Sequence, residues 1–192
     1  MYNSYSYFFK VCLISGKAGH GKDTVAQSLK HLLEQQGEKV LIIKFGDAVK
    51  WFAREYYNYT GIKDVKERSL LQYIGTEMMR SYDKNYWGRI VSEFIAANTD
   101  FTYALIPDWR FKSELKMIKK HNKNIITLRV VRGNEESLWV NPNMTAEQQQ
   151  HISEIELDNF EFDYIVNNFG TYDDLNATVQ DTLNLINNNL KL

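Results

Sequence analysis

Residues 16–24 of the chain read Gly16-Lys17-Ala18-Gly19-His20-Gly21-Lys22-Asp23-Thr24. The segment fits the pattern G-x-x-x-x-G-K, in which glycines let the backbone wrap around an anion while successive amides point inward. An apolar run precedes it and a helical pattern follows it, so Lys22 adds a mobile charge at the positive end of a helix dipole. All nine residues are therefore expected to hold a nucleoside triphosphate, with ATP the expected donor and Lys22 at its β- and γ-phosphates.

Asp23 stands where this pattern usually has a Ser or Thr whose hydroxyl binds Mg²⁺. We expect Asp23 either to hold the water shell of a magnesium ion, which usually keeps several waters, or to be an ordinary first-turn carboxylate of the helix. Thr24 is expected to contact the α-phosphate. His20 is expected to contribute its backbone rather than its imidazole.

Strand-like and helix-like segments alternate along the 192 residues. Short apolar runs predict buried strands at residues 8–15, 39–45, 103–107, 124–131 and 162–166. Apolar residues at helical spacing predict helices at 22–36, 112–120 and 175–190, and a long helix-rich region at 48–97. This alternation favours an α/β fold with a parallel sheet covered on both faces, in one domain. A polar excursion at 133–150 interrupts the pattern and is expected to be functional or mobile.

The composition is that of an ordinary globular protein, with 44% apolar and 24% charged residues. A net charge of −1 gives no sign of a nucleic-acid footprint or of a membrane partner. The chain has one cysteine and shows neither a signal peptide nor a membrane span, which favours a cytoplasmic location. The sequence leaves the oligomeric state open between a monomer and a homodimer.

Charged residues follow the predicted strands, at the sheet edge where α/β folds bind ligands. Asp108 comes directly after the third strand and is expected to hold Mg²⁺ or orient an attacking phosphate oxygen, although it could instead cap the following helix. Arg110 lies two residues further on, and Arg132 begins the polar excursion as the candidate lid arginine, with Arg129 as the alternative. We expect Lys22, Asp108, Arg110 and Arg132 to carry the catalysis, and Asp23 and Asp108 to serve the metal.

Two more arginines in the helix-rich region are candidates for the acceptor site. Arg80 and Arg54 could clamp an anionic acceptor together with Arg110, because a guanidinium binds phosphate in a bidentate manner. Each of them could also be a solvated surface charge. Trp87 and Tyr73 could stack on a base, but their helical spacing among apolar residues favours core packing.

Several segments in order resemble the deoxynucleoside monophosphate kinases of phages. The resemblance runs from about residue 11 to 168 and rests on Gly21-Lys22-Asp23-Thr24, Leu71-Gln72-Tyr73-Ile74-Gly75-Thr76-Glu77, Tyr86-Trp87, Ala104-Leu105-Ile106-Pro107-Asp108-Trp109-Arg110, Val130-Val131-Arg132 and His151-Ile152-Ser153-Glu154. It implies the three-layer P-loop fold of nucleoside monophosphate kinases, with a five-stranded parallel sheet. It also implies a substrate-binding helical region at about 46–98 and a lid at about 132–151.

The resemblance implies that Asp47 borders the acceptor and that His151 and Glu154 are lid or acceptor contacts. The expected activity is transfer of the γ-phosphate of ATP to a nucleoside or deoxynucleoside monophosphate. Two alternatives stay open: a kinase for another phosphorylated acceptor, such as dephospho-coenzyme A or an isoprenoid precursor, and a regulatory ATPase. Against a guanine-nucleotide switch, Asn122-Lys123-Asn124-Ile125 lacks the Asp of the guanine-reading motif.

Overall fold

A five-stranded parallel sheet forms the centre of the computed structural model, which describes residues 10–62, 64–134 and 137–189. Its strands lie in the order β2-β3-β1-β4-β5. Their bounds are β1 (Lys10–Ser15), β2 (Val40–Ile42), β3 (Tyr103–Ile106), β4 (Asn124–Arg132) and β5 (Tyr164–Asn168). Cys12 in the central strand β1 lies opposite Leu105 on one side and Ile126 on the other. The expected α/β fold with a five-stranded parallel sheet is confirmed.

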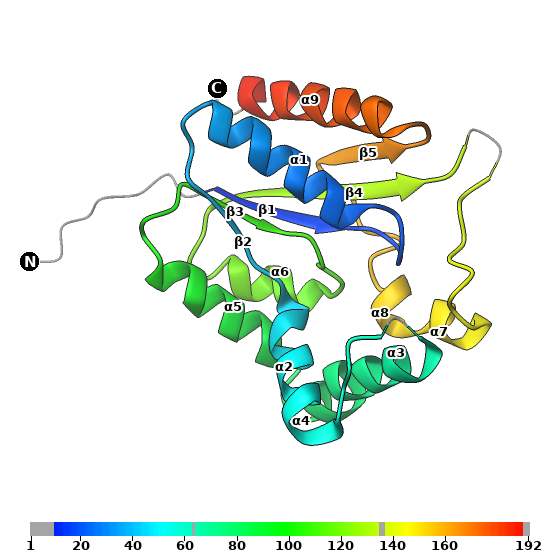
Figure 1. Ribbon diagram of the computed structural model, residues 1–192. Coiled ribbons are helices and arrows are strands. Elements are labelled where there is room, and N and C mark those ends of the chain that lie inside the picture. The colour runs from blue at the N-terminus through cyan, green and yellow to red at the C-terminus, as the bar shows by residue number, and fades with distance from the viewer. Residues whose placement is uncertain (1–9, 63, 135–136, 190–192) are drawn as a thin grey trace, which may run out of the picture.

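Helices cover both faces of this sheet (Figure 1). On one face lie α1 (Lys22–Gln35) and α9 (Tyr172–Asn189), which contact each other. On the opposite face lie α2 (Phe45–Tyr57), α5 (Tyr86–Ala97) and α6 (Lys112–Ile118). The result is the three-layer arrangement that strands alternating with helices predict.

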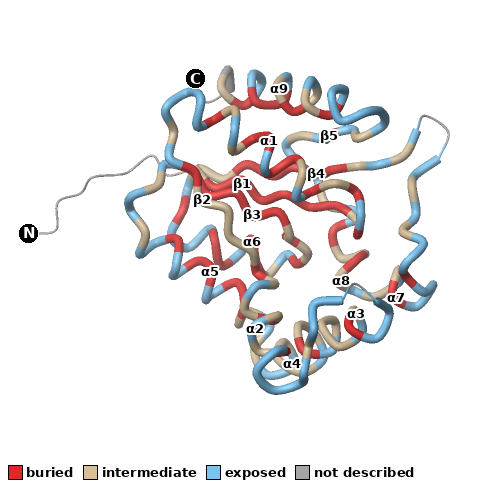
Figure 2. Tube along the Cα trace, viewed as in Figure 1, coloured by how far each residue is buried: buried red, intermediate tan, exposed pale blue. Residues whose placement is uncertain are grey.

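The sheet separates two apolar cores, and the inner strands β1 and β3 are the most fully buried (Figure 2). Alternation along β1 explains the separation, because successive side chains of a strand point to opposite faces. Cys12 and Ile14 pack in the core under α1 and α9, where burial raises the pKa of the Cys12 thiol. Val11 and Leu13 pack in the core under α2 and α5.

The second strand is shorter than predicted, because residue Phe45 begins α2 instead of ending β2. The amides of Phe45 and Gly46 donate to the two carboxylate oxygens of Asp108 at 2.9 and 2.6 Å. A distant carboxylate therefore caps this helix, an interaction that local sequence does not reveal. The predicted strand residues 8 and 9 and helix residue 190 lie outside the described residues.

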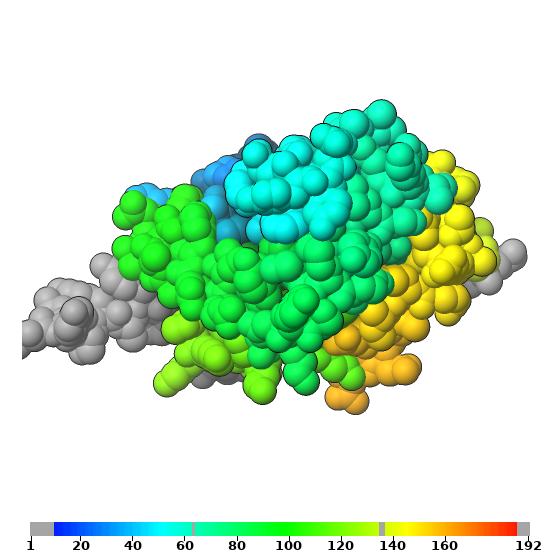
Figure 3. Space-filling view, turned by 90° about the horizontal axis from the view of Figure 1, so that it is seen from below, coloured from blue at the N-terminus to red at the C-terminus, as the bar shows by residue number. Residues whose placement is uncertain are grey.

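After α2, the helix-rich region between β2 and β3 contains three helical elements that follow one another directly. They are α3 (Val65–Gln72), the π-helical η1 (Tyr73–Met78) and α4 (Met79–Tyr82). Two short helices, α7 (Ala146–Gln150) and α8 (Ile152–Ile155), lie beside these elements. The buried amide of Gln148 in α7 donates to Val65 O and Ser69 Oγ of α3, both at 2.8 Å. Figure 3 shows the segment from α3 to α4 and the segment from α7 to α8 side by side on the face seen from below. They close one side of a cavity at the sheet edge.

Candidate active site

A cavity of about 740 Å³ opens at the carboxyl ends of the strands, a size usual for small-molecule sites. Residues at or after the carboxyl end of each of the five strands line it. They include Lys22 after β1, Lys44 after β2, Asp108 after β3, Arg132 at the end of β4 and Asn168 at the end of β5. The opposite wall comes from α2, α3 and η1.

The predicted phosphate loop leads from β1 into α1 and forms one end of the cavity. Gly21, the residue before α1, has a left-handed backbone, and no side chain caps the helix there. The first-turn amides of α1 therefore have no side-chain acceptor at this end, which suits an anion. Ala18, Gly19 and the run from Gly21 to Thr24 line the cavity, whereas Gly16, Lys17 and His20 do not.

Lys22 is buried beneath this loop, and its Nζ donates to Gly16 O and Lys17 O, both at 2.8 Å. Burial, aided by the charge of Arg110, lowers its pKa to about 7. A phosphate would provide the counter-charge that this ammonium lacks. The loop and Lys22 therefore have the geometry and electrostatics of a site for a polyphosphate.

The segment after β4 lies over the loop. The indole of Trp139 contacts Gly19, and the guanidinium of Arg132 lies 4.7 Å from the indole centroid and donates to Gly19 O at 3.2 Å. His20 Nδ1 accepts from Arg132 N at 3.2 Å, and its Nε2 lies 3.1 Å from Trp139 O. The imidazole of His20 thus ties the loop to the polar excursion, a role beyond the backbone contribution expected for it, and burial lowers its pKa.

Substitution of Gly19 by Ala is expected to weaken ATP binding by about tenfold or more. Gly19 has φ +86°, and a Cβ atom there would lie 2.4 Å from Trp139, so the loop must shift. Gly37 has φ +85° with nothing within 4 Å, so Gly37→Ala carries the same backbone cost without the clash. Titration of ATP into both variants checks this; equal affinities would mean that the loop tolerates displacement.

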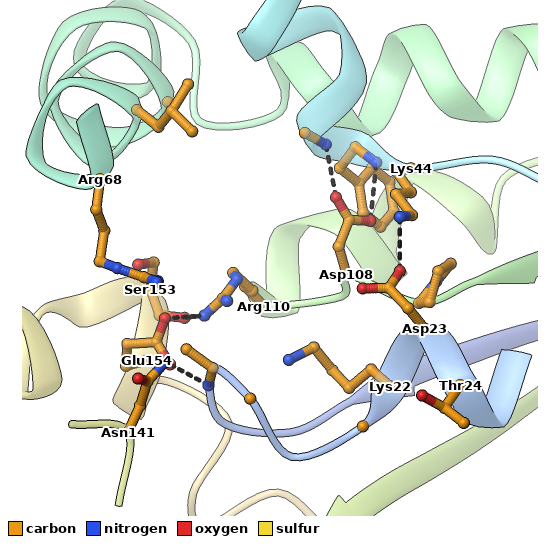
Figure 4. A pocket seen from close by; sticks show the side chains of 18 of the residues that line it. Lys22, Asp23, Thr24, Lys44, Arg68, Asp108, Arg110, Asn141, Ser153 and Glu154 are labelled. Atoms are coloured by element: carbon orange, nitrogen blue, oxygen red, sulfur yellow. Dashed lines mark hydrogen bonds and ion pairs between the residues drawn. The ribbon is translucent and has the colours of Figure 1, made fainter. Parts of the chain in front are cut away.

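Asp108 lies between the loop and α2, and its carboxylate is held by the α2 amides. Burial raises its pKa, and the two amide hydrogen bonds oppose that rise. Asp23 points into the same space and pairs with Lys44 at 2.6 Å (Figure 4). Burial alone would lower the pKa of Lys44, but the pairing with Asp23 outweighs burial, so the pKa of Lys44 is raised. The structure thus brings the two predicted magnesium residues to one side of the cavity.

Arg110 forms an ion pair with the buried carboxylate of Glu154, which joins α8 to the loop. Glu154 Oε2 also accepts from Ala18 N at 3.0 Å, and Lys17 Nζ donates to Glu154 O at 2.8 Å. Arg110 further donates to Ser153 O at 2.8 Å. Arg110, predicted after the third strand, and Glu154, predicted beside the lid segment, therefore meet at the phosphate loop.

A polar stripe at a spacing of four residues runs along α3, η1 and α4 and lines the far wall: Arg68, Gln72, Thr76 and Arg80. Arg68 points from α3 into the cavity toward Ser153 (Figure 4). Arg80 was predicted from the sequence as a site residue, whereas Arg68, Gln72 and Thr76 were not. The spacing was a signal that could have found them, because side chains four apart share one face of a helix.

Two predicted substrate contacts do not line the cavity. Asp47 lies in the first turn of α2, where it pairs with Lys50 at 3.3 Å. Arg54 is exposed on the same helix, with its guanidinium 5.7 Å from the ring centroid of Tyr59. Trp87 lines the cavity but is buried in the core, and its Nε1 donates to Gly75 O at 3.0 Å. Tyr73 is half exposed and does not line the cavity.

His151 precedes α8 and does not line the cavity. Its Nε2 lies 2.7 Å from Glu77 Oε1 of η1, and its Nδ1 lies 2.8 Å from Ser153 Oγ. It therefore links the lid segment to the helix-rich region. Within residues 10–62, 64–134 and 137–189, no three or more His, Cys, Asp or Glu side chains gather as a metal-binding group. No helix in this part of the chain is both long and apolar enough to cross a membrane.

A phosphate loop that faces several arginines across one cavity, on a 2-3-1-4-5 parallel sheet, defines a P-loop phosphotransferase. Residues 57–179 match the model of the family described as deoxynucleotide monophosphate kinase. This match covers more than half of the chain and begins after the phosphate loop, so the loop is evidence independent of the match. The chain belongs to the deoxynucleotide monophosphate kinase family and is an ATP-dependent kinase of nucleotides or other small molecules. No curated protein matches its sequence.

Solved structures with the same fold are P-loop kinases of low sequence identity. A gluconokinase from Sinorhizobium meliloti superposes with a TM-score of 0.57 at 12% identity, covering 96% of this chain and 97% of that one. A sugar kinase from Janibacter sp. gives 0.55 at 15% identity, with 92% and 95% covered. Shikimate kinase from Acinetobacter baumannii, in complex with shikimate, gives 0.52 at 14% identity, with 95% and 96% covered. At these identities the likeness concerns the fold alone.

Proposed function

We propose that the protein transfers the γ-phosphoryl group of ATP to a nucleoside or deoxynucleoside monophosphate and so forms the diphosphate. Membership of the deoxynucleotide monophosphate kinase family supports a nucleotide acceptor. The cavity supports a reaction between two anions, because it has a phosphate loop at one end and arginines on the opposite wall. Residues 46–98 would form the acceptor region, and residues 132–151 the lid.

One observation supports an acceptor site beside Arg68 and Arg80. Two buried side-chain polar atoms lack a hydrogen-bond partner in the described part of the chain, namely Nε of Arg68 and Nε of Arg80. Both arginines line the cavity. A buried N–H without a partner costs about 1–3 kcal/mol, so its retention calls for an explanation. An acceptor phosphate between the two guanidinium groups would supply the missing acceptors.

The chemistry asks mainly for positive charge and alignment, because the attacking phosphate oxygen is already anionic. Lys22 and the amides of the phosphate loop would stabilise charge on the β- and γ-phosphates. Arg110 lies between the loop and the acceptor wall, so it would hold the transferring group and the acceptor together. Arg132, which already contacts the loop, would reach the same phosphates from the lid. Closure over the cavity would exclude water, so that transfer outcompetes hydrolysis.

A magnesium ion would arrive with ATP and offset the charge of its phosphates. The two carboxylates fit such an ion, because each has acceptor capacity beyond the bonds it makes here. Asp23 and Asp108 would hold it, in part through its retained waters.

The test is a coupled assay of ADP release with ATP and each common ribo- and deoxyribonucleoside monophosphate. We expect ADP release that depends on at least one of these acceptors. Release that depends only on dephospho-coenzyme A or a phosphorylated isoprenoid precursor would move the acceptor outside nucleotides. Slow hydrolysis that no acceptor accelerates would support the regulatory ATPase instead.

A further inference from the structure

Glu114 in the first turn of α6 lines the cavity and is 1% exposed. Its Oε1 forms an ion pair with Arg80 Nη2. Its Oε2 accepts from the backbone amides of Arg110 and Phe111, both at 3.0 Å. One carboxylate therefore holds the side chain of one cavity arginine and the backbone of the other.

Arg80 is fixed on several sides around this ion pair. Its guanidinium lies 3.8 Å from the ring centroid of Phe111, and its Nη1 donates to Lys84 O at 3.1 Å. The Arg80 side chain is 9% exposed and the Glu114 side chain 2%. The ion pair thus holds Arg80 in place, while Nε, the donor that we assign to the acceptor phosphate, stays without a partner.

The buried carboxylate is not explained by stability alone. Burial raises the pKa of Glu114 to about 7, although Arg80 and the two amides oppose that rise. A buried ion pair is often no more stabilising than apolar residues of similar volume. A neutral Gln at this position could also accept from the backbone amide of Phe111, the residue before α6. Only a charged carboxylate serves the helix start and the guanidinium together.

We propose that Glu114 is a positioning residue that holds Arg80 and Arg110 in the geometry in which they bind the acceptor phosphate. The inference rests on the proposed function, since it concerns the acceptor side of the same cavity. Glu114 acts through the arginines and does not itself touch the reacting atoms. Its removal should therefore affect the acceptor far more than ATP.

The test compares Glu114→Gln with Glu156→Gln in the same ADP-release assay. Glu156 Oε1 also bonds the start of α6, at Lys112 N and 2.7 Å, but this carboxylate neither lines the cavity nor pairs with an arginine. We expect Glu114→Gln to raise the KM of the acceptor by about tenfold to hundredfold, since small displacements of positioning groups can cost that much. The KM of ATP should change less than twofold, and Glu156→Gln should change neither value by more than about twofold.

Glu114→Gln could unfold the protein, because it leaves Arg80 without a counter-charge. The double variant with Arg80→Met and Glu114→Gln removes both charges of the ion pair, so it leaves neither side chain as an unpaired charge and can be tested even if Glu114→Gln alone does not fold. If Glu114 acts through Arg80 and Arg110, the rise in the acceptor KM of the double variant should be smaller than the two single variants would give if their effects were additive. Additive losses, or equal changes in the KM of ATP and of the acceptor, would overturn the inference.

The two proposals fail in different ways. If the wild-type protein uses only a non-nucleotide phosphate acceptor, the proposed function is wrong, and the same KM comparison with that acceptor still decides the role of Glu114. If nucleotide transfer is observed but Glu114→Gln leaves the acceptor KM unchanged, only the inference about Glu114 is wrong. If no phosphorylated acceptor accelerates ADP release from the wild type, both are wrong.

Discussion

Lys22→Met is expected to lower the rate of phosphoryl transfer by about 10²- to 10³-fold while the protein stays folded. The magnitude is that of losing one preorganised donor to developing charge in a site that excludes water. Lys22 is the buried cation of the phosphate loop, and its Nζ now rests on two loop carbonyls. Methionine keeps the length of the side chain and removes only its charge and its hydrogen bonds.

Stability without nucleotide should not fall in this variant. The folded pKa of Lys22, about 7, lies below the ordinary lysine value of 10.5, so the unfolded state binds more protons between these values. Stability therefore drops as pH falls from about 10 to about 7, and the charged lysine opposes folding at neutral pH. Removing it should leave the thermal midpoint unchanged or higher at pH 7.

Lys30→Met is the control, because Lys30 lies on the same helix and pairs with Glu34 at the surface. It should keep wild-type turnover. Turnover would be measured with saturating ATP and acceptor, and folding by thermal unfolding. Near-normal turnover of Lys22→Met would contradict the role assigned to the phosphate loop.

The sequence sufficed for the parts of the fold that local patterns specify. The phosphate loop was recognisable because a strand, a glycine-rich turn and a helix follow one another without interruption. The five strands were recognisable as short apolar runs, most clearly β1 and β3, which are buried on both faces. Their parallel pairing follows from the helices between them.

The contacts that shape the acceptor side could not be predicted in the same way. Asp108 was expected to hold Mg²⁺ or orient the attacking phosphate oxygen, or else to cap the helix that follows it. The helix that its carboxylate caps is instead α2, about sixty residues earlier, and the expected role toward Mg²⁺ or the phosphate stays a prediction. Glu114 resembled any acidic residue in a first helical turn, although it reaches Arg80 from another element. Such roles depend on tertiary packing, and the spacing of residues in the sequence does not predict contacts between distant elements.

Arg54 and Arg68 illustrate the same limit. Both lie in the helix-rich region, and the sequence alone does not show which of them is the better candidate for the acceptor phosphate. The packing of α3 against α7 directs Arg68 inward, whereas Arg54 stays at the surface of α2. Arg68 is therefore the better candidate for the acceptor phosphate, and the two arginines form a matched pair for a test.

Arg68→Met should raise the KM of the acceptor by about tenfold to hundredfold, since a hydrogen bond to a charged group contributes about 1.5–3 kcal/mol. The described part of the chain gives the Arg68 guanidinium no ion-pair partner, so its removal breaks none there and stability should change little. The KM of ATP should change less than twofold, and Arg54→Met should keep the wild-type KM for the acceptor. If only Arg54→Met raised that value, the acceptor phosphate would lie outside the cavity, and the unpaired Nε atoms would need another explanation.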